Sequence, residues 1–78
     1  MEFKPKYDYS KLKGKIVENG FSNKTFAKAV GMSISSLYNK FACNSYFTQD
    51  EIELIKKVLR LKDSEVVLIF FTLKVKKN

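Results

Sequence analysis

One local pattern of apolar and polar residues occurs four times along the chain. An apolar or aromatic residue is followed by Asp, Ser or Thr, and a second apolar residue stands four places after the polar one. The short polar side chain can accept a hydrogen bond from a first-turn N–H, and the flanking apolar pair can pack across the helix start. The pattern therefore predicts helix starts, and Asp63-Ser64-Glu65 indicates a fifth one. The four polar residues are Asp8, Ser22, Ser33 and Thr48.

Helix ends are predicted between these starts. Gly20 and Gly31 can take the left-handed conformation that ends a helix, and Asn44-Ser45 suits a loop. The expected helices are 9–18, 23–30, 34–41, 49–60 and 64–70. Their apolar positions recur at helical spacing and predict one core. The expected core residues are Leu12, Ile16, Phe26, Ala27, Val30, Leu37, Phe41, Ile52, Ile55, Val58 and Leu59. The expected fold class is all-α, a compact five-helix domain that covers residues 1–78.

The two ends of the chain follow different patterns. Residues 1–6 are polar and basic, which predicts a loose basic arm. Residues 71–78 begin with alternating apolar and polar positions, which is typical of an extended segment. Such a tail either folds back on the core or pairs with a second copy across a two-fold axis. The packed tail is the interpretation that we favour.

Composition excludes several classes of function. The chain has 78 residues with a net charge of +7, and it contains no His, no Trp and a single Cys, Cys43. These counts exclude a disulfide framework, an ordinary zinc cluster and His-based acid–base catalysis, so neither an enzyme nor a bound cofactor or metal is expected. The longest apolar run, Val66–Phe71, is far shorter than the ~20 residues of a membrane helix. We therefore expect a cytoplasmic protein without a secretion signal, a membrane partner or a small-molecule ligand.

Positive charge is concentrated in the first half of the chain. Residues 9–47 contain six Lys and one acid, Glu18. The field of such a segment attracts a polyanion, although surface lysines are also ordinary in small domains. Charge alone does not separate these two interpretations.

The expected second and third helices are separated only by Gly31-Met32-Ser33. A turn this short with a Gly forces a sharp angle, as in a helix-turn-helix. Ala27 suits the close approach of crossing helices, and Met32 and Leu37 suit buried contacts that hold the angle. An ordinary helical hairpin is the alternative, but the spacing together with the basic half favours a DNA-binding domain.

The stretch SNKTFAKAVGMSISSLYNKF resembles the helix-turn-helix of phage repressor and Cro-type regulators, the XRE family. The resemblance extends to the five-helix, lambda-repressor-like layout over about residues 8–70, and the chain ends are similar to small regulators from phages of Gram-positive bacteria. Asn23 stands where the family usually has a phosphate-contacting Gln, and the third helix lacks the Gln and Arg that often contact bases. The resemblance therefore implies the docking mode more strongly than any base contact. The matching residues are Ser22, Phe26-Ala27, Val30-Gly31-Met32-Ser33 and Leu37.

In this docking mode the third helix enters the major groove. The face opposite Leu37 and Phe41 then offers the candidate base contacts Ile34, Ser35, Tyr38 and Asn39. Asn39 can make a bidentate pair with adenine, and Ile34 can pack on a thymine methyl. The edges of this face offer the candidate phosphate contacts Asn23, Lys24, Lys40, Asn44 and Ser45.

The function that we expect from the sequence is specific binding of double-stranded DNA, by a phage-type transcriptional repressor that occupies its operator at the nucleoid of a bacterial host. A single module buries only ~600–1,000 Å², so we expect a homodimer on an inverted repeat. Candidate dimer surfaces are Val67 and Phe70 of the expected fifth helix, and Phe71, Leu73 and Val75 of the tail. The alternative is a protein-interaction module with the same shape, such as an antirepressor or an antitoxin-like partner.

Overall fold

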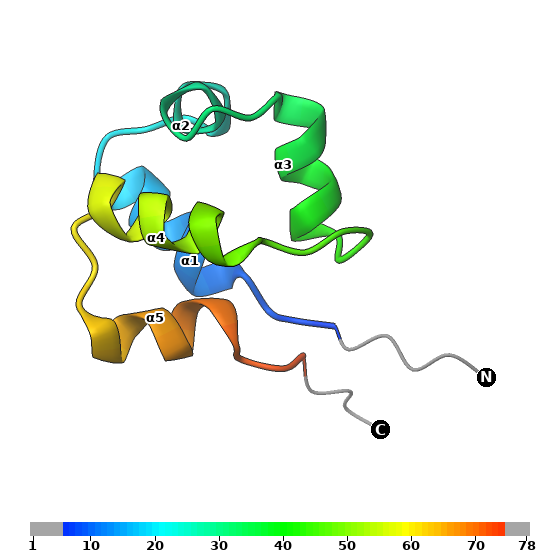
Figure 1. Cartoon of the computed structure of the whole chain (residues 1–78), viewed down its shortest axis with the longest axis vertical. Coiled ribbons are helices and arrows are strands. Elements are labelled where there is room, and N and C mark those ends of the chain that lie inside the picture. The colour runs from blue at the N-terminus through cyan, green and yellow to red at the C-terminus, as the bar shows by residue number, and fades with distance from the viewer. Residues whose placement is uncertain (1–5, 75–78) are drawn as a thin grey trace.

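The computed structural model describes residues 6–74 and contains five α-helices and no strand within them (Figure 1). The expected all-α class is confirmed. Two packed pairs organise the fold, with the second helix against the third and the first against the fifth. The helices are α1 (Ser10–Glu18), α2 (Asn23–Ala29), α3 (Ile34–Phe41), α4 (Gln49–Val58) and α5 (Asp63–Phe70).

Three of the predicted helix starts are confirmed by capping hydrogen bonds. The Ser22 hydroxyl accepts from the Thr25 N–H at 3.1 Å, and the Thr48 hydroxyl accepts from the Glu51 N–H at 3.1 Å. Glu51 closes a capping box, because its carboxylate accepts from the Thr48 N–H at 2.8 Å. Ser33 caps α3 in the same way. These bonds join residues three apart, which explains why the sequence alone places them.

The first and last helices begin one residue away from their predicted positions. Tyr9 is the N-cap of α1, and the Asp8 carboxylate instead accepts from the Ser10 N–H at 2.9 Å. At α5 the N-cap is Lys62, whose N–H donates to the Glu65 carboxylate at 3.0 Å. Both starts still use an acidic side chain near the first turn, where the free N–H groups attract negative charge.

Four helices end through a residue with positive φ. Gly20 (φ 81°) and Gly31 (φ 72°) were predicted, whereas Cys43 (φ 62°) and Arg60 (φ 55°) were not. In all four cases the N–H of the following residue donates to the carbonyl five positions before it, at 2.9–3.0 Å. The left-handed turns at Gly31 and Arg60 follow α2 and α4, which end at Ala29 and Val58, slightly before the expected limits.

The core is one cluster, as the apolar spacing predicts. Its largest fully buried side chains are Phe26, Leu12, Ile16, Leu37 and Ile55. Three residues expected inside are only partly buried and pack around the cluster: Phe41, Ile52 and Val58. The core also contains buried residues that were not expected there, and the burial of Phe70 removes it from the candidate dimer surface. These residues are Tyr9, Cys43, Leu61, Ile69 and Phe70.

Residues 72–74 of the tail fold back onto the chain entering α1, which is the first of the two arrangements expected for it. The Asp8 N–H donates to the Thr72 carbonyl at 2.8 Å, and the Lys74 N–H donates to the Lys6 carbonyl at 2.8 Å. Tyr7 and Leu73 form an antiparallel bridge between these bonds. Lys6 is therefore held by the tail rather than loose. The other residues of the expected arm and tail, 1–5 and 75–78, lie outside the described residues.

Over residues 6–74, no helix has the length and apolar character needed to cross a membrane.

Candidate nucleic-acid interface

Helices α2 and α3 meet as a tight, strongly crossed pair. Figure 1 shows α2 end-on while α3 is seen along its length. Ala27 of α2 is buried in the core, with 1% of its surface exposed, and Met32 packs against the core from the turn. The positive φ of Gly31 lets the chain reverse within three residues. Two strongly crossed helices joined by a three-residue turn thus form this corner of the molecule.

The outward face of α3 carries three of the four candidate base contacts. Ser35, Tyr38 and Asn39 are exposed, with Tyr38 at 53%, while Leu37 is buried on the opposite face. Ile34 is half-buried and packs against the core. Exposed Ala42, just after the helix, continues the stripe of Ser35, Tyr38 and Asn39 by helical spacing. Sequence reasoning missed Ala42 because it carries no hydrogen-bonding group.

Lys40 does not lie on the exposed edge where a phosphate contact was expected. Lys40 is only 9% exposed, and its Nζ donates to the Tyr46 carbonyl at 3.0 Å. The same Nζ lies 3.2 Å from the Glu51 carboxylate and 5.8 Å from the centre of the Phe47 ring. We therefore correct the assignment of Lys40: its charge is used inside the protein, to tie the end of α3 to the start of α4.

The Glu51 carboxylate is held in its charged form at this junction. Burial raises its pKa, but the hydrogen bond from the Thr48 N–H and the neighbouring Lys40 ammonium bring the pKa below its ordinary value. The carboxylate thus keeps its charge at neutral pH. No sequence signal pointed to this ion pair, because Lys40 and Glu51 are eleven positions apart and lie on different helices.

The other candidate phosphate contacts border the α3 stripe. Asn23 and Lys24 form the first turn of α2, with Asn23 half-buried and Lys24 exposed. Asn44 and Ser45 are exposed in the loop after α3, and their N–H groups donate to the Asn39 carbonyl at 2.9 and 3.4 Å. The structure therefore ties this loop directly to the backbone of the best base-contacting candidate.

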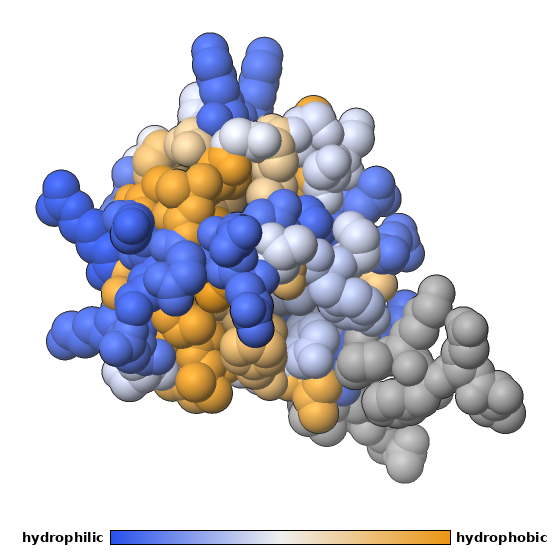
Figure 2. Space-filling model, viewed as in Figure 1, coloured by the Kyte–Doolittle hydropathy of each residue, from blue (hydrophilic) through white to orange (hydrophobic). Residues whose placement is uncertain are grey.

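The charged residues of α2, α3 and the loops that flank them are all lysines. No Asp or Glu occurs between Glu18 and Asp50, which spans α2, α3 and their loops. Lys24 and Lys28 are exposed on α2. Figure 2 shows strongly hydrophilic side chains projecting beyond α2, whereas the surface over α3 is mostly pale, with strongly hydrophilic side chains at its outer edge. An uncharged helix face bordered by cations suits contact with base edges between two phosphate backbones.

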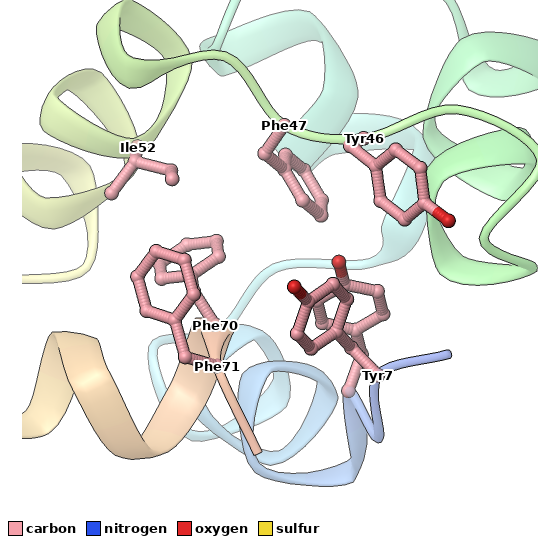
Figure 3. Close-up of a pocket in the computed structure, with 7 residues that line it drawn as sticks. Tyr7, Tyr46, Phe47, Ile52, Phe70 and Phe71 are labelled. Atoms are coloured by element: carbon pink, nitrogen blue, oxygen red, sulfur yellow. The ribbon is translucent and has the colours of Figure 1, made fainter. Parts of the chain in front are cut away.

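A cluster of aromatic rings supports the loop that follows α3. The rings surround a small pocket of about 140 Å³, and Figure 3 shows Tyr46 and Phe47 of this loop facing Tyr7, Phe70 and Phe71. Tyr7 and Tyr46 meet edge-to-face with centroids 6.0 Å apart, and Phe47 and Phe70 do so at 5.4 Å. The loop after α3 is therefore packed against both ends of the chain.

The sulfur of Cys43 belongs to the same support. Cys43 is buried, and its Sγ accepts from the Tyr7 N–H at 3.3 Å. Within the described part of the chain, no three His, Cys, Asp or Glu side chains are grouped so that they could hold a metal ion.

A family model described as "Protein of unknown function (DUF739)" matches residues 5–73. The chain belongs to the DUF739 family. The matched segment includes all five helices and the loop after α3, and Lys74 is the one described residue of this DUF739 protein outside it. No curated protein matches the chain.

Proposed function

We propose that this DUF739 protein binds double-stranded DNA sequence-specifically, as a transcriptional repressor of the phage type that acts by occupying its operator. One observation carries the proposal: α3 exposes a short polar stripe at a helix–turn–helix corner whose surrounding sequence contains no acidic residue. The resemblance of residues 22–41 to Cro-type regulators supports the same docking mode.

In the proposed complex, α3 lies in the major groove, which is wide enough for one helix. Asn39 pairs with an adenine edge, and Ser35 and Tyr38 contact neighbouring bases. Contacts from Asn23 and Lys24 on one side and from the Asn44-Ser45 loop on the other hold the phosphates of the two strands. The ion pair of Lys40 and Glu51 acts indirectly, by holding the end of α3 in place.

One copy contacts too little DNA for tight binding, so the proposal includes two copies on an inverted repeat. The half-sites then lie about one helical turn apart, roughly 10 base pairs. Such a protein works where its operator is, in the cytoplasm and at the nucleoid of the bacterial host. Occupied operator DNA excludes polymerase without a bound effector.

The test is selection of bound duplexes from a random library at about 0.15 M salt, where non-specific binding is weak. We expect enrichment of an inverted repeat. Asn39→Ala should relax the base preference at one position of each half-site, whereas Lys24→Glu should weaken binding to all sequences alike. Lys57→Glu, an equal charge change at an exposed position of α4, serves as the control and should change neither the affinity nor the selected sequence. Recovery of no DNA, or of DNA without a preferred sequence, contradicts the proposal.

A protein-interaction module is the second candidate, and one observation favours it. With Lys40 buried, the exposed stripe of α3 carries no charge of its own. An uncharged face with an exposed Tyr also suits a protein partner. Salt separates the two candidates, because phosphate binding weakens steeply between 50 and 200 mM salt, whereas an apolar protein contact changes little.

A further inference from the structure

The middle of α1 contains a glycine that this molecule does not explain. Gly14 stands in the interior of the helix, where Gly is less favourable than any residue except Pro. A Cβ built at Gly14 meets no atom within 4 Å, and its φ is not positive. Neither packing nor backbone conformation within one copy therefore calls for a glycine here. A missing side chain does allow another backbone to approach closely.

The surface around Gly14 is hollowed and partly apolar. Gly14 lines a hollow of about 270 Å³ between α1 and α5, together with Lys11, Glu18 and Leu68. Leu68 is 55% exposed, and Val17, three residues from Gly14 on α1, is 72% exposed. Covering these two side chains would remove apolar surface from water when a partner docks.

The charged side chains on this face can pair with those on the same face of a second copy. Lys11 and Glu18 lie on either side of Gly14, about 10 Å apart along the helix axis. If two α1 helices cross antiparallel near Gly14, Lys11 of one copy faces the partner's Glu18, and the reverse pair forms at the same time. Glu18 is available for this contact, because its side chain is 68% exposed although it lies 3.6 Å from Lys15.

We propose that the α1–α5 face is the surface on which a second copy of this chain docks, through an antiparallel crossing of the two α1 helices at Gly14. The proposal deepens the proposed function, which calls for two copies on one operator. Figure 1 places α5 across the molecule from α2, so this contact leaves the α3 stripe free. The apolar part is small beside the ~800 Å² per partner of a standard interface, and we expect association in the micromolar range.

The first test is sedimentation equilibrium of the full chain without DNA, from about 10 µM to 1 mM. Wild type should dimerise, and Gly14→Leu should weaken dimerisation at least tenfold because the side chain separates the two helices. The same variant should unfold at a higher temperature, by roughly 4–8 °C, since Leu is the better helix former and the position is open. A variant that folds more stably but associates more weakly has lost an interface, whereas a damaged fold would lower both the stability and the association.

The second test exchanges the charges. Lys11→Glu should weaken association about tenfold or more, because like charges then face each other at two places. The double variant Lys11→Glu with Glu18→Lys has the net charge of wild type and should restore association to within about threefold. Lys57→Glu, the same charge change on exposed α4, should dimerise like wild type.

Two outcomes overturn the proposal: a chain that stays monomeric at 1 mM, or a Gly14→Leu variant and a Lys11→Glu variant that both associate like wild type. Failure of the double variant to restore association overturns the antiparallel pairing. Because no DNA is present, these results are independent of the duplex selection, and a dimer that selects no DNA sequence still supports the interface.

Discussion

Replacing Glu51 by Gln is expected to destabilise the protein while leaving the start of α4 intact. The Glu51 carboxylate accepts from the Thr48 N–H at 2.8 Å and also lies 3.2 Å from the Lys40 ammonium. Glutamine can keep the capping bond, because the capping box accepts either Glu or Gln. Only the negative charge is lost, so the substitution isolates the ion pair.

The magnitude follows from the burial of the two partners. Breaking a buried ion pair by removing one charge costs about 3–5 kcal/mol, because the remaining charge is left without compensation. Here the Lys40 side chain is 11% exposed and the Glu51 side chain 27%, and Lys40 keeps its bond to the Tyr46 carbonyl. Partial solvent access and the retained bond reduce the loss to about 2 kcal/mol. For a domain of this size, that lowers Tm by roughly 8–16 °C.

The effect should depend on pH in one direction. The pKa of Glu51 lies below its ordinary value of 4.5, because the Thr48 N–H and Lys40 outweigh the effect of burial. A lowered folded-state pKa stabilises the protein above pH 4.5, and this stabilisation is lost as pH falls through the folded-state value. The difference between wild type and Glu51→Gln should therefore be full at pH 6–7 and shrink below about pH 4.5.

Urea unfolding followed by circular dichroism measures both quantities. Glu53→Gln, the same substitution at an exposed position of α4, is the control and should change stability by less than about 0.5 kcal/mol. A double-mutant cycle with Lys40→Met should give a coupling of at least about 1 kcal/mol. If Glu51→Gln and Glu53→Gln unfold alike at pH 7, the ion pair does not hold α3 to α4 as we argue.

Three further predictions concern helix ends and the core. Arg60→Gly should stabilise the protein by about 0.5–1 kcal/mol in urea unfolding, because an exposed Arg with φ 55° is strained. Gly31→Ala, at φ 72°, should destabilise it by about 1 kcal/mol, because Ala is strained at this angle. Equal effects of the two substitutions on the free energy of unfolding would contradict this. Phe26→Ala should cost about 3–5 kcal/mol, because the side chain is fully buried, and a loss below 1 kcal/mol would show that the cavity collapses. Burial raises the pKa of Tyr9 to about 12, so ultraviolet titration should show a late phenol step that Tyr9→Phe removes. Stability from this group is present below pH 10 and is lost as pH rises towards 12.

The candidate site was predictable where one helix decides the geometry. Helical spacing alone places Ser35, Tyr38 and Asn39 opposite the buried Leu37, and the structure has them exposed. Lys40 was misplaced because its neighbours on the helix do not determine where a long side chain ends. Its ammonium contacts Glu51 of α4 and the Tyr46 carbonyl, and these groups come together only in the folded chain. The ring support of the loop after α3 was missed for the same reason, since it joins both ends of the chain to its middle.

By itself, the sequence determined the elements of this protein. The capping side chains Ser22, Ser33 and Thr48 and the glycines at 20 and 31 act through hydrogen bonds and backbone angles within a few residues. Such interactions need no tertiary contact, so the number of helices, three of their starts and the all-α class follow directly.

Only the tertiary structure decided which exceptions to these local rules are stable. Cys43 takes a left-handed conformation although it is not a glycine, and its Sγ accepts from the N–H of Tyr7, thirty-six positions away. Tyr9 and Phe70 are buried where each ring meets Phe47, from the loop after α3, edge-to-face at 5.4 Å. The free energy of such contacts depends on segments that meet only in the folded chain, and a local pattern carries no information about it.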